Sequence, residues 1–578
     1  MNLIKNAHWK DFMAEQKICK QCGAQFMVED EDLAFYKKIS PTFDGKTFEI
    51  PSPTLCPTCR EIRRLVWRNE LNLYNRKSDK SGKNIVSIYS PDKTQYKVYG
   101  IDEWWADDWD ATSYCEEFDP SKDFFGQFDL LLKRVPRLAL FNTKTENCEY
   151  ANYIAECRNC YMSSIVYYQT ENTHYSYWVY NSKNNIDLSH CDRVDNSYML
   201  TGCDNCYGCM YSQGLSDCRD CKFSFNLRGC SDCLFCSNLS HKQYCIENNQ
   251  YSKEEYDQKI NQYNFSSRKS IDEYQKKYEQ LKSSAIVRYA KLTNCENCLG
   301  DDLTNCKNCR YCFSGIEMEN CKYCSGISEK TYNVFDSRGG TYEWALETNH
   351  TGFGKNLIVT SGVLYSSNMY YCENCHSCQD CFGCVGLRNK QYCILNKQYT
   401  KEEYEQKVTQ IIEKMTESGE WGEFFPISLS PFAYNESLAN QDYPKAKEEV
   451  EIISAKWLDK LYDINFQGEF YVPEDNINVY KDEGKLRELL AGVIKCEVTD
   501  RPFKIMPQEA AFYISNGIPV PTKHFAQRVK ERESLCNPRK LYHRKCMNEG
   551  CQNEFETTYA PDRPEKVYCE SCYQKIIL

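Results

Sequence analysis

The stretch DCRDCKFSFNLRGCSDCLFC, residues 217–236, contains five cysteines at regular positions. Cys218 and Cys221 recur twelve positions later as Cys230 and Cys233, and the same interval continues on both sides of this stretch. A period near twelve, with aromatic and Asn residues in between, is typical of short strands joined by tight turns, because helix faces recur every three to four residues. The sequence therefore predicts a β-solenoid, in which each coil gains its core by stacking on its neighbours.

The repeat occupies the middle of the chain and is itself duplicated. Of the 37 cysteines, 26 lie between Cys148 and Cys393. The segment CSDCLFCSNLSHKQYCIENNQYSKEEYDQKI, from Cys230, returns 148 residues later as CQDCFGCVGLRNKQYCILNKQYTKEEYEQKV, from Cys378. Each copy ends in a Lys- and Tyr-rich stretch where apolar residues return at helical spacing. We expect two solenoid lobes, each closed by a helix that covers its open sheet edge.

Three chemistries are open for the thiols of these lobes. Adjacent coils can enclose a metal, and then the possible ligands are Cys206, Cys209, Cys218, Cys221, Cys230 and Cys233. The same thiols can instead pack as small apolar groups in a ladder. Oxidised, they can form disulfides, which a reducing compartment disfavours.

Size and charge indicate a folded protein outside the membrane. At 578 residues the chain can bury a core without disulfides, and its net charge is −11. Its start, MNLIKNAHWKDFMAEQKI, carries charges throughout and lacks the apolar run of a signal peptide. No apolar run reaches the eighteen residues that a membrane helix requires. The sequence predicts a cytoplasmic location, no membrane partner, and nothing about the oligomeric state.

The two ends of the chain carry the ligand spacing of structural zinc sites. Two CxxC-type knuckles separated by a loop supply four thiolates to one tetrahedral Zn²⁺. The predicted metal ligands are Cys19, Cys22, Cys56 and Cys59 at one end, and Cys546, Cys551, Cys569 and Cys572 at the other. Because four protein ligands leave no open coordination position, we expect both sites to be structural.

The ends are also copies of one another. The register places Cys19 on Cys496, Cys56 on His524, Cys59 on Gln527, Arg60 on Arg528, Asn69 on Asn537, Gly100 on Cys569 and Glu103 on Cys572. Each end therefore reads as two ribbons, of which one has lost its ligands. The first ribbon is intact at the N-terminal end, and the second at the C-terminal end.

At these motifs a family resemblance appears. The segment CKQCGAQFMVEDEDLAFY…LCPTCREIRR resembles the probable zinc-ribbon domain of bacterial proteins, with its two CxxC knuckles around an F…FY core. Through KQYCI.N.QYSKEEY and YAPDRPE.VYC the full chain resembles a group of cysteine-rich proteins of uncultivated bacteria, some of which carry the label caib/baif family. That label implies a CoA-transferase, but no motif of this sequence indicates such chemistry. The resemblance implies zinc binding and architecture, without an activity.

We expect a mostly β fold with short helices, in which terminal zinc-ribbon or treble-clef units flank a cysteine-rich β-solenoid-like region. The predicted domains are a two-ribbon unit (1–110), a connector (111–147), repeat lobe 1 (148–262), a helical segment (263–294), repeat lobe 2 (295–400), a helical or irregular connector (401–490) and a second two-ribbon unit (491–578).

Basic segments follow one ribbon at each end. Residues 60–83 hold eight Lys and Arg against three acidic residues, and residues 523–545 hold eight against two. A basic element beside a zinc knuckle is suited to phosphates, whereas the alternative is a helix with ordinary surface ion pairs. The candidate nucleic-acid contacts are Arg60, Arg63, Arg64, Arg68, Lys540, Arg544 and Lys545.

Signals for an enzyme are weak, and no catalytic residue is predicted. The eight histidines form no HExxH motif, and DKSGKN lacks the first glycine of a P-loop. The sequence thus favours a zinc-binding, non-catalytic scaffold or adaptor for a macromolecule, either nucleic acid or protein. The alternatives are a protein–protein scaffold acting through the solenoid face and a metal- or thiol-dependent enzyme of unknown reaction.

Overall fold

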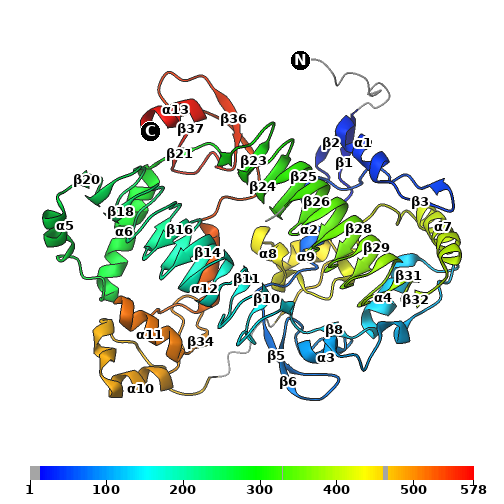
Figure 1. Ribbon diagram of the computed structural model, residues 1–578, viewed down its shortest axis with the longest axis horizontal. Helices are drawn as coiled ribbons and strands as arrows, with labels where there is room; N and C mark the ends of the chain where they lie inside the picture. The colour runs from blue at the N-terminus through cyan, green and yellow to red at the C-terminus, as the bar shows by residue number, and fades with distance from the viewer. Residues whose placement is uncertain (1–13, 328–329, 460–465, 578) are drawn as a thin grey trace. The chain divides into compact units, whose positions relative to one another are not determined.

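The architecture is built around parallel β-solenoids. The computed structural model describes residues 14–327, 330–459 and 466–577 (Figure 1). The described chain is mostly β, with 25% helix, about 21 solenoid turns and a cysteine cluster near each terminus, which confirms the expected fold class. It divides into two compact units: unit 1 comprises residues 1–139 and 290–459, and unit 2 comprises residues 140–289 and 460–578. Each unit therefore combines one terminal segment with one solenoid.

The solenoid of unit 2 is formed by short strands that pair in parallel, mostly with a register of twelve, as Leu188 does with Leu200, and with a register of thirteen between β11 and β13. Isolated parallel bridges continue the stack between its last regular strands. Its strands are β9 (Asn142–Thr143), β10 (Asn152–Ala155), β11 (Ser164–Tyr167), β12 (Glu171–His174), β13 (Tyr177–Tyr180), β14 (Lys183–Asp195), β15 (Tyr198–Thr201), β16 (Asp204–Tyr207), β17 (Met210–Gln213), β18 (Ser231–Leu234), β19 (Gln243–Ile246) and β20 (Asn249–Gln250).

The solenoid of unit 1 is an 11-stranded sheet with the same design. In both solenoids the last pair of strands is antiparallel and ends the stack in a hairpin. The strands of unit 1 are β22 (Leu292–Thr293), β23 (Leu299–Thr304), β24 (Arg310–Ile316), β25 (Met318–Ile327), β26 (Thr331–Arg338), β27 (Tyr342–Asn349), β28 (Gly354–Ser361), β29 (Ser367–Glu373), β30 (Gln379–Phe382), β31 (Gln391–Ile394) and β32 (Lys397–Gln398).

Each coil turns at left-handed residues placed every third position. Asn205, Gly208, Tyr211 and Gly214 all have a positive φ, and the series repeats from Asp217. Twelve residues per coil with a corner every three give four short sides. A left-handed conformation is unfavourable for most L-residues, which explains why Asn, Asp and Gly recur at these positions. Asn side chains at successive corners also bond to one another along the stack, as in the 3.0 Å contact of Asn147 with Asn159.

The residue after each corner points inward, and this position holds most of the cysteines. A side of three residues encloses limited space, and cysteine, serine and, on some sides, Leu188, Leu200 and Leu227 fill this inward position. The Cys221 thiol donates to the carbonyl of Arg219 at 3.3 Å and lies 3.7 Å from that of Cys230 on the next coil. Ser224 makes the corresponding bond to Lys222 at 2.9 Å. Cysteine and serine therefore have the same role inside the solenoid. Both fill the narrow core and donate a hydrogen bond to a backbone carbonyl that points inward.

The terminal segments share one element order, except that the hairpin β3–β4 of the N-terminal copy has no counterpart in the described part of the C-terminal copy. The N-terminal copy contains β1 (Glu15–Ile18), β2 (Gln25–Val28), α1 (Asp30–Ile39), β3 (Thr42–Phe43), β4 (Lys46–Thr47), α2 (Pro57–Leu65), β5 (Tyr74–Lys77), β6 (Asn84–Ser87), β7 (Val98–Tyr99) and α3 (Ile101–Trp105). The C-terminal copy contains β33 (Ile494–Lys495), β34 (Pro502–Phe503), α11 (Pro507–Asn516), α12 (Phe525–Ser534), β35 (Tyr542–Lys545), β36 (Glu554–Thr557), β37 (Lys566–Tyr568) and α13 (Glu570–Ile577).

Helices follow both solenoids where the repeated KEEY motifs predict them. Ser252 and Thr400 are N-caps whose side chains accept from the backbone of Glu255 and Glu403, and each glutamate bonds back in a capping box. These helices are α5 (Lys253–Ile260), which α6 (Arg268–Ser284) follows, and α7 (Lys401–Ser418). The other elements are α4 (Phe124–Arg134), β8 (Arg137–Leu138), β21 (Ile286–Arg288), α8 (Leu438–Asp442), α9 (Lys447–Ile452), α10 (Glu483–Ala491) and four short 3₁₀ helices.

Within each unit a corresponding helix of the terminal copy docks on the solenoid. In unit 1, α2 contacts β26 and β27. In unit 2 the equivalent helix α12 contacts β14 and β15. The duplication thus extends from the ribbons to the way in which they attach to a solenoid.

Candidate metal centres

The first candidate centre joins the turn after β1 to the start of α2. Cys19 and Cys22 lie in a turn closed by the bond from the Gly23 N–H to the Cys19 carbonyl, where Gly23 has φ +72°. Cys56 is the N-cap of α2, and Cys59 lies in its first turn. The four sulfur atoms lie within 4.8 Å of one another.

The geometry of this group fits a tetrahedral metal. Cys22 Sγ and Cys56 Sγ are 3.8 Å apart. A regular tetrahedron with Zn–S bonds of about 2.3 Å has edges of about 3.8 Å. The hydrogen bond with Cys59 lowers the pKa of Cys56 to about 5, so this thiol ionises readily.

The second candidate centre lies between the end of β35 and the start of α13. Cys546, Cys551, Cys569 and Cys572 form the group, and their sulfur atoms also lie within 4.8 Å of one another. Cys551 Sγ and Cys569 Sγ are 3.8 Å apart. The two knuckles at each end are therefore brought together as the spacing predicts.

Hydrogen-bond donors surround the sulfurs of this second group. The backbone N–H of Cys569 donates to Cys546 Sγ at 3.3 Å, and Asn553 Nδ2 donates to Cys569 Sγ at 3.4 Å. Burial would raise the pKa of Cys569, but hydrogen bonds from Ser571 and Asn553 outweigh it and lower the pKa to about 6. Donors of this kind stabilise thiolates, the form in which cysteine binds a metal.

The ribbon without cysteines in unit 1 is held by a carboxylate. Glu103 accepts hydrogen bonds from the Ser78 hydroxyl and, at 2.9 Å, from the Gly100 N–H. Burial would raise the pKa of Glu103, but these bonds and one from Ser81 lower it below its ordinary value. One side chain thus links two loops that correspond to the two cysteine-bearing loops of the other ribbon.

The corresponding ribbon in unit 2 keeps Cys496 but has Thr499, His524 and Gln527 at the other ligand positions. His524 is the N-cap of α12, and its Nδ1 accepts from the Ala526 N–H at 3.1 Å. Among the described residues these four side chains form no cluster of three or more ligand atoms. His376 lies between Cys375 and Cys378 in the sequence. Its Nε2 lies 3.0 Å from Asn374 Oδ1, and its ring packs against the rings of Trp104 and Trp105.

The arginines that follow Cys59 are buried in ion pairs. Arg60 Nε donates to Asp336 Oδ1 at 3.0 Å, and Arg64 Nη1 donates to Glu347 Oε2 at 2.5 Å. Arg63 pairs with Glu423 at 2.6 Å. These side chains attach α2 to the solenoid of unit 1, so they do not offer their charges to a phosphate.

Arg68 is buried as well, and it pairs with Glu70 and donates to the Arg338 carbonyl at 3.2 Å. The sequence analysis does not predict Asp336 and Glu347 as the solenoid partners of these arginines. A signal was present, because Asp336 and Glu347 are acidic residues inside a buried repeat, where charges normally need a partner.

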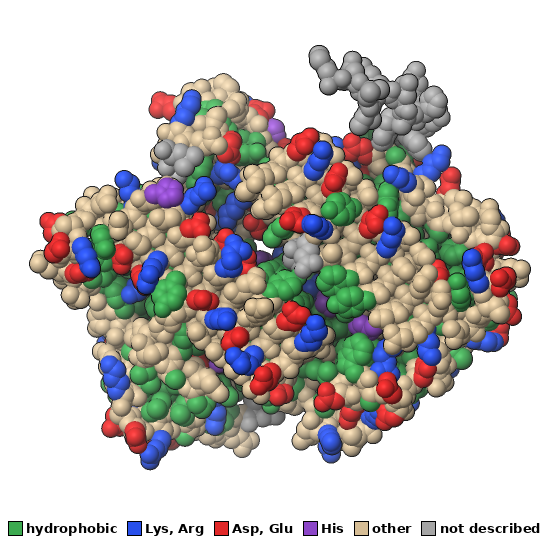
Figure 2. All heavy atoms as spheres, viewed as in Figure 1, with side chains coloured by type: hydrophobic (Ala, Val, Ile, Leu, Met, Phe, Trp, Pro, Cys, Tyr) green, Lys and Arg blue, Asp and Glu red, His purple; other side chains and the backbone are tan. Residues whose placement is uncertain are grey.

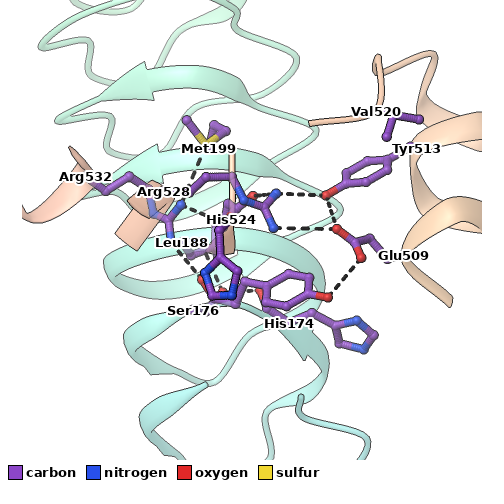
Figure 3. A network of polar contacts seen from close by, with 12 residues as sticks. His174, Ser176, Leu188, Met199, Glu509, Tyr513, Val520, His524, Arg528 and Arg532 are labelled. Carbon is purple, nitrogen blue, oxygen red and sulfur yellow. Dashed lines mark hydrogen bonds and ion pairs between the residues drawn. The ribbon is translucent and has the colours of Figure 1, made fainter. Parts of the chain in front are cut away.

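Unit 2 repeats this attachment. Asp187, fully buried in β14, receives Arg528 Nη1 at 2.6 Å and Arg532 Nη1 at 2.7 Å. Figure 3 shows Arg528 near Tyr513 and Glu509. Arg528 donates a hydrogen bond to the Tyr513 hydroxyl and forms an ion pair with Glu509. The arginines that the two copies share are thus docking residues.

The C-terminal basic candidates lie in or near the hairpin β35–β36. Lys545 is exposed and pairs with Glu554 at 2.9 Å, and Arg544 donates to the Ala560 carbonyl at 3.0 Å. Lys540 is exposed and lies over the ring of Tyr542. Figure 2 shows basic side chains interspersed with acidic ones on the face that it presents. The hairpin therefore carries less free positive charge than its sequence suggests.

The central cysteines do not gather into a comparable cluster. Every cysteine of the described residues is a free thiol. In the described part of the chain, no group of three or more ligand atoms within 4.8 Å includes Cys206, Cys209, Cys218, Cys221, Cys230 or Cys233. Their carbonyl hydrogen bonds favour the packed-thiol interpretation over metal or disulfides.

An open groove of about 590 Å³ lies along the N-terminal ends of strands β26 to β29 in unit 1. Three aromatic side chains that line the groove are exposed: Tyr332 by 38%, Phe353 by 50% and Tyr365 by 62%. Phe353 and Tyr365 stack at 4.9 Å. Lys355 and Glu343, which also line the groove, form an ion pair at 3.0 Å.

Among the helices of the described residues, none combines the length and the apolar character needed to cross a membrane. A scan against protein-family models finds no match, and a comparison with curated proteins finds none either. The structure itself therefore supplies the functional inference: two four-cysteine groups able to hold a metal ion, and a solenoid surface suited to interaction.

Proposed function

We propose that the chain is a non-catalytic cytoplasmic scaffold, in which zinc stabilises a ribbon at each end and the solenoid of unit 1 binds a protein partner. The observation that carries the proposal is the groove with its exposed Tyr332, Phe353 and Tyr365. Large exposed aromatics beside one another are costly in water and are enriched at binding hot spots.

Zinc is the metal that the terminal groups suit best. Four thiolates in a tetrahedral arrangement are typical of structural Zn²⁺, and such sites have no position left for substrate. The same chemistry supports the resemblance to zinc ribbons, since the metal joins two knuckles that each end a short hairpin or begin a helix. We infer one zinc ion at each end.

A protein partner is favoured over nucleic acid by the charges. Arg60, Arg63 and Arg64 are paired with Asp336 or Glu347 of the solenoid, and Lys545 is paired on its hairpin. Nucleic-acid binding depends on lysines and arginines that are free to meet phosphates. The groove offers aromatic surface with the paired Lys355 and Glu343 and a single further lysine, Lys330, which suits a polypeptide segment better than a run of phosphates.

Metal analysis of protein purified under reducing conditions tests the zinc sites. We expect two zinc equivalents from the terminal groups, and the double variant C19S/C56S should lose one of them. The control is Cys115→Ser, because Cys115 is exposed and lies outside both groups. Zinc content unchanged in C19S/C56S would refute the N-terminal site.

The protein-binding role of the groove is tested by comparing the partners that the immobilised wild type and its variants retain from a cell extract. The double variant F353A/Y365A should lose specific protein partners that the wild type retains after nuclease treatment. The control is Tyr207→Ala, which removes a 48% exposed aromatic from the other solenoid. Capture that is equal in all three proteins, or that disappears with nuclease, would contradict a protein-binding groove; the second result would favour nucleic acid.

A further inference from the structure

A third set of metal-ligating side chains lies in unit 2, outside both cysteine groups. His190 lies on β14, Glu533 lies in the last turn of α12, and Cys536 follows the C-cap of that helix. One ligand atom from each lies within 4.8 Å of the others, and His190 Nε2 is 3.0 Å from Glu533 Oε2. We propose that these three side chains form a third metal site, distinct in chemistry from the terminal groups.

The present bonds leave part of this cluster unsatisfied. Glu533 Oε1 is buried and has no hydrogen-bond partner among the described residues. The Cys536 thiol lies 4.0 Å from the Arg532 carbonyl, at the limit for a sulfur hydrogen bond. An unpaired carboxylate oxygen is expensive to bury, so a cation between these groups would supply the missing interaction.

The surrounding structure holds the ligands in place. His190 is three residues after Asp187, the carboxylate that receives Arg528 and Arg532 of α12. These ion pairs attach the helix that carries Glu533 to the strand that carries His190. The ring of Trp178 stacks on the imidazole at 5.0 Å. Fixed ligands of this kind are a requirement of a metal site.

The N-terminal copy lacks the cluster. Arg60 corresponds to Arg528 and Asn69 to Asn537, an offset of 468, so Glu533 and Cys536 correspond to Leu65 and Arg68. Leu65 and Arg68 are both buried in unit 1. The docking arginines are shared between the copies, whereas the candidate ligands are specific to the C-terminal one, which indicates that docking alone does not require them.

The ligand set defines the class of metal. An imidazole nitrogen, a carboxylate oxygen and a thiolate suit a borderline divalent cation such as Zn²⁺ or Co²⁺. Three protein ligands leave one tetrahedral position for water or an anion. The side chains of His190 and Glu533 are 15% and 13% exposed and Cys536 is partly exposed, so the cluster lies close to the surface.

Cobalt binding to the full chain tests the site. Reduced, metal-free protein is loaded with Co²⁺, and bound cobalt is counted after desalting. We expect three equivalents in the wild type and two in H190A and in C536S, with the thiolate-to-cobalt absorption of the terminal groups retained. The control is H241A, which removes an exposed histidine from another left-handed corner of the same solenoid and should keep three equivalents.

Two further measurements use the wild type and do not depend on folding of a variant. Adding Zn²⁺ should slow alkylation of Cys536, followed by peptide mass spectrometry, at least tenfold. Azide should change the absorption of the third cobalt equivalent. Two equivalents in the wild type with unprotected Cys536 would overturn the third site and leave the terminal sites standing; a third equivalent insensitive to azide would overturn the open position.

Discussion

Asp187→Asn should release α12 from the solenoid of unit 2. The fully buried Asp187 carboxylate receives two guanidinium groups, from Arg528 at 2.6 Å and Arg532 at 2.7 Å. Breaking a buried ion pair by removing one charge costs about 3–5 kcal/mol, because the remaining charge is left uncompensated. Asparagine keeps an acceptor oxygen and tolerates the left-handed φ of +61° at this corner, so we expect about 3 kcal/mol.

Hydrogen exchange resolved by peptide measures this effect where it occurs. A loss of about 3 kcal/mol corresponds to about 100-fold faster exchange of the α12 amides that open with the docked helix. The matched control is Asp204→Asn in the same solenoid, which breaks a 2.6 Å pair with Arg193 whose side chains are 45% and 55% exposed. That variant should cost less than about 1 kcal/mol. Equal exchange of α12 in the two variants would refute the docking role of Asp187.

Two other predictions concern the solenoid interiors. Cys221→Ser should cost about 1 kcal/mol and Cys221→Ala about 2 kcal/mol, because serine keeps a donor for the Arg219 carbonyl and fills more of the space; a serine variant less stable than the alanine variant in urea unfolding would contradict the hydrogen-bonding role of this thiol. Burial, with a contribution from Arg388, lowers the pKa of His376 to about 3. An unfolded chain therefore binds a proton at this residue between about pH 6.5 and 3 that the folded chain does not, so stability should fall with decreasing pH there by up to about 1.4 kcal/mol per pH unit. His376→Gln should reduce that slope in acid titrations of unfolding, and an unchanged slope would show that His376 does not contribute.

Whether serine or alanine is the milder replacement for Cys221 depends on the hydrogen bonds that the inward thiols make. A dry ladder of apolar sulfur would make alanine the milder replacement for Cys221. The structure instead places Ser212, Ser224 and Cys236 at successive levels of one stack, with the Ser224 N–H bonded to Ser212 Oγ at 3.0 Å and the Cys236 N–H to Ser224 Oγ at 3.2 Å. Hydroxyl and thiol are interchangeable there because both accept from the next coil and donate to a carbonyl.

Much of the fold was predictable because its signals are local. The twelve-residue spacing from Cys218 to Cys230 predicts stacked coils, and the KEEY motifs predict the helices that follow them. The terminal knuckles were predictable for the same reason: a metal requires Cys19 and Cys22 to share one turn, and Cys56 and Cys59 to share another.

The sequence by itself determined the coils, the duplications and the two four-cysteine groups, since each is a short pattern repeated at a fixed interval. Only the tertiary structure decided what the charged residues do. Arg60 meets Asp336 across 276 positions and Arg528 meets Asp187 across 341, and no local period records such a pairing. An arginine beside a zinc knuckle looks the same in sequence whether it faces a phosphate or a buried carboxylate, because the difference is the desolvated partner that folding brings to it.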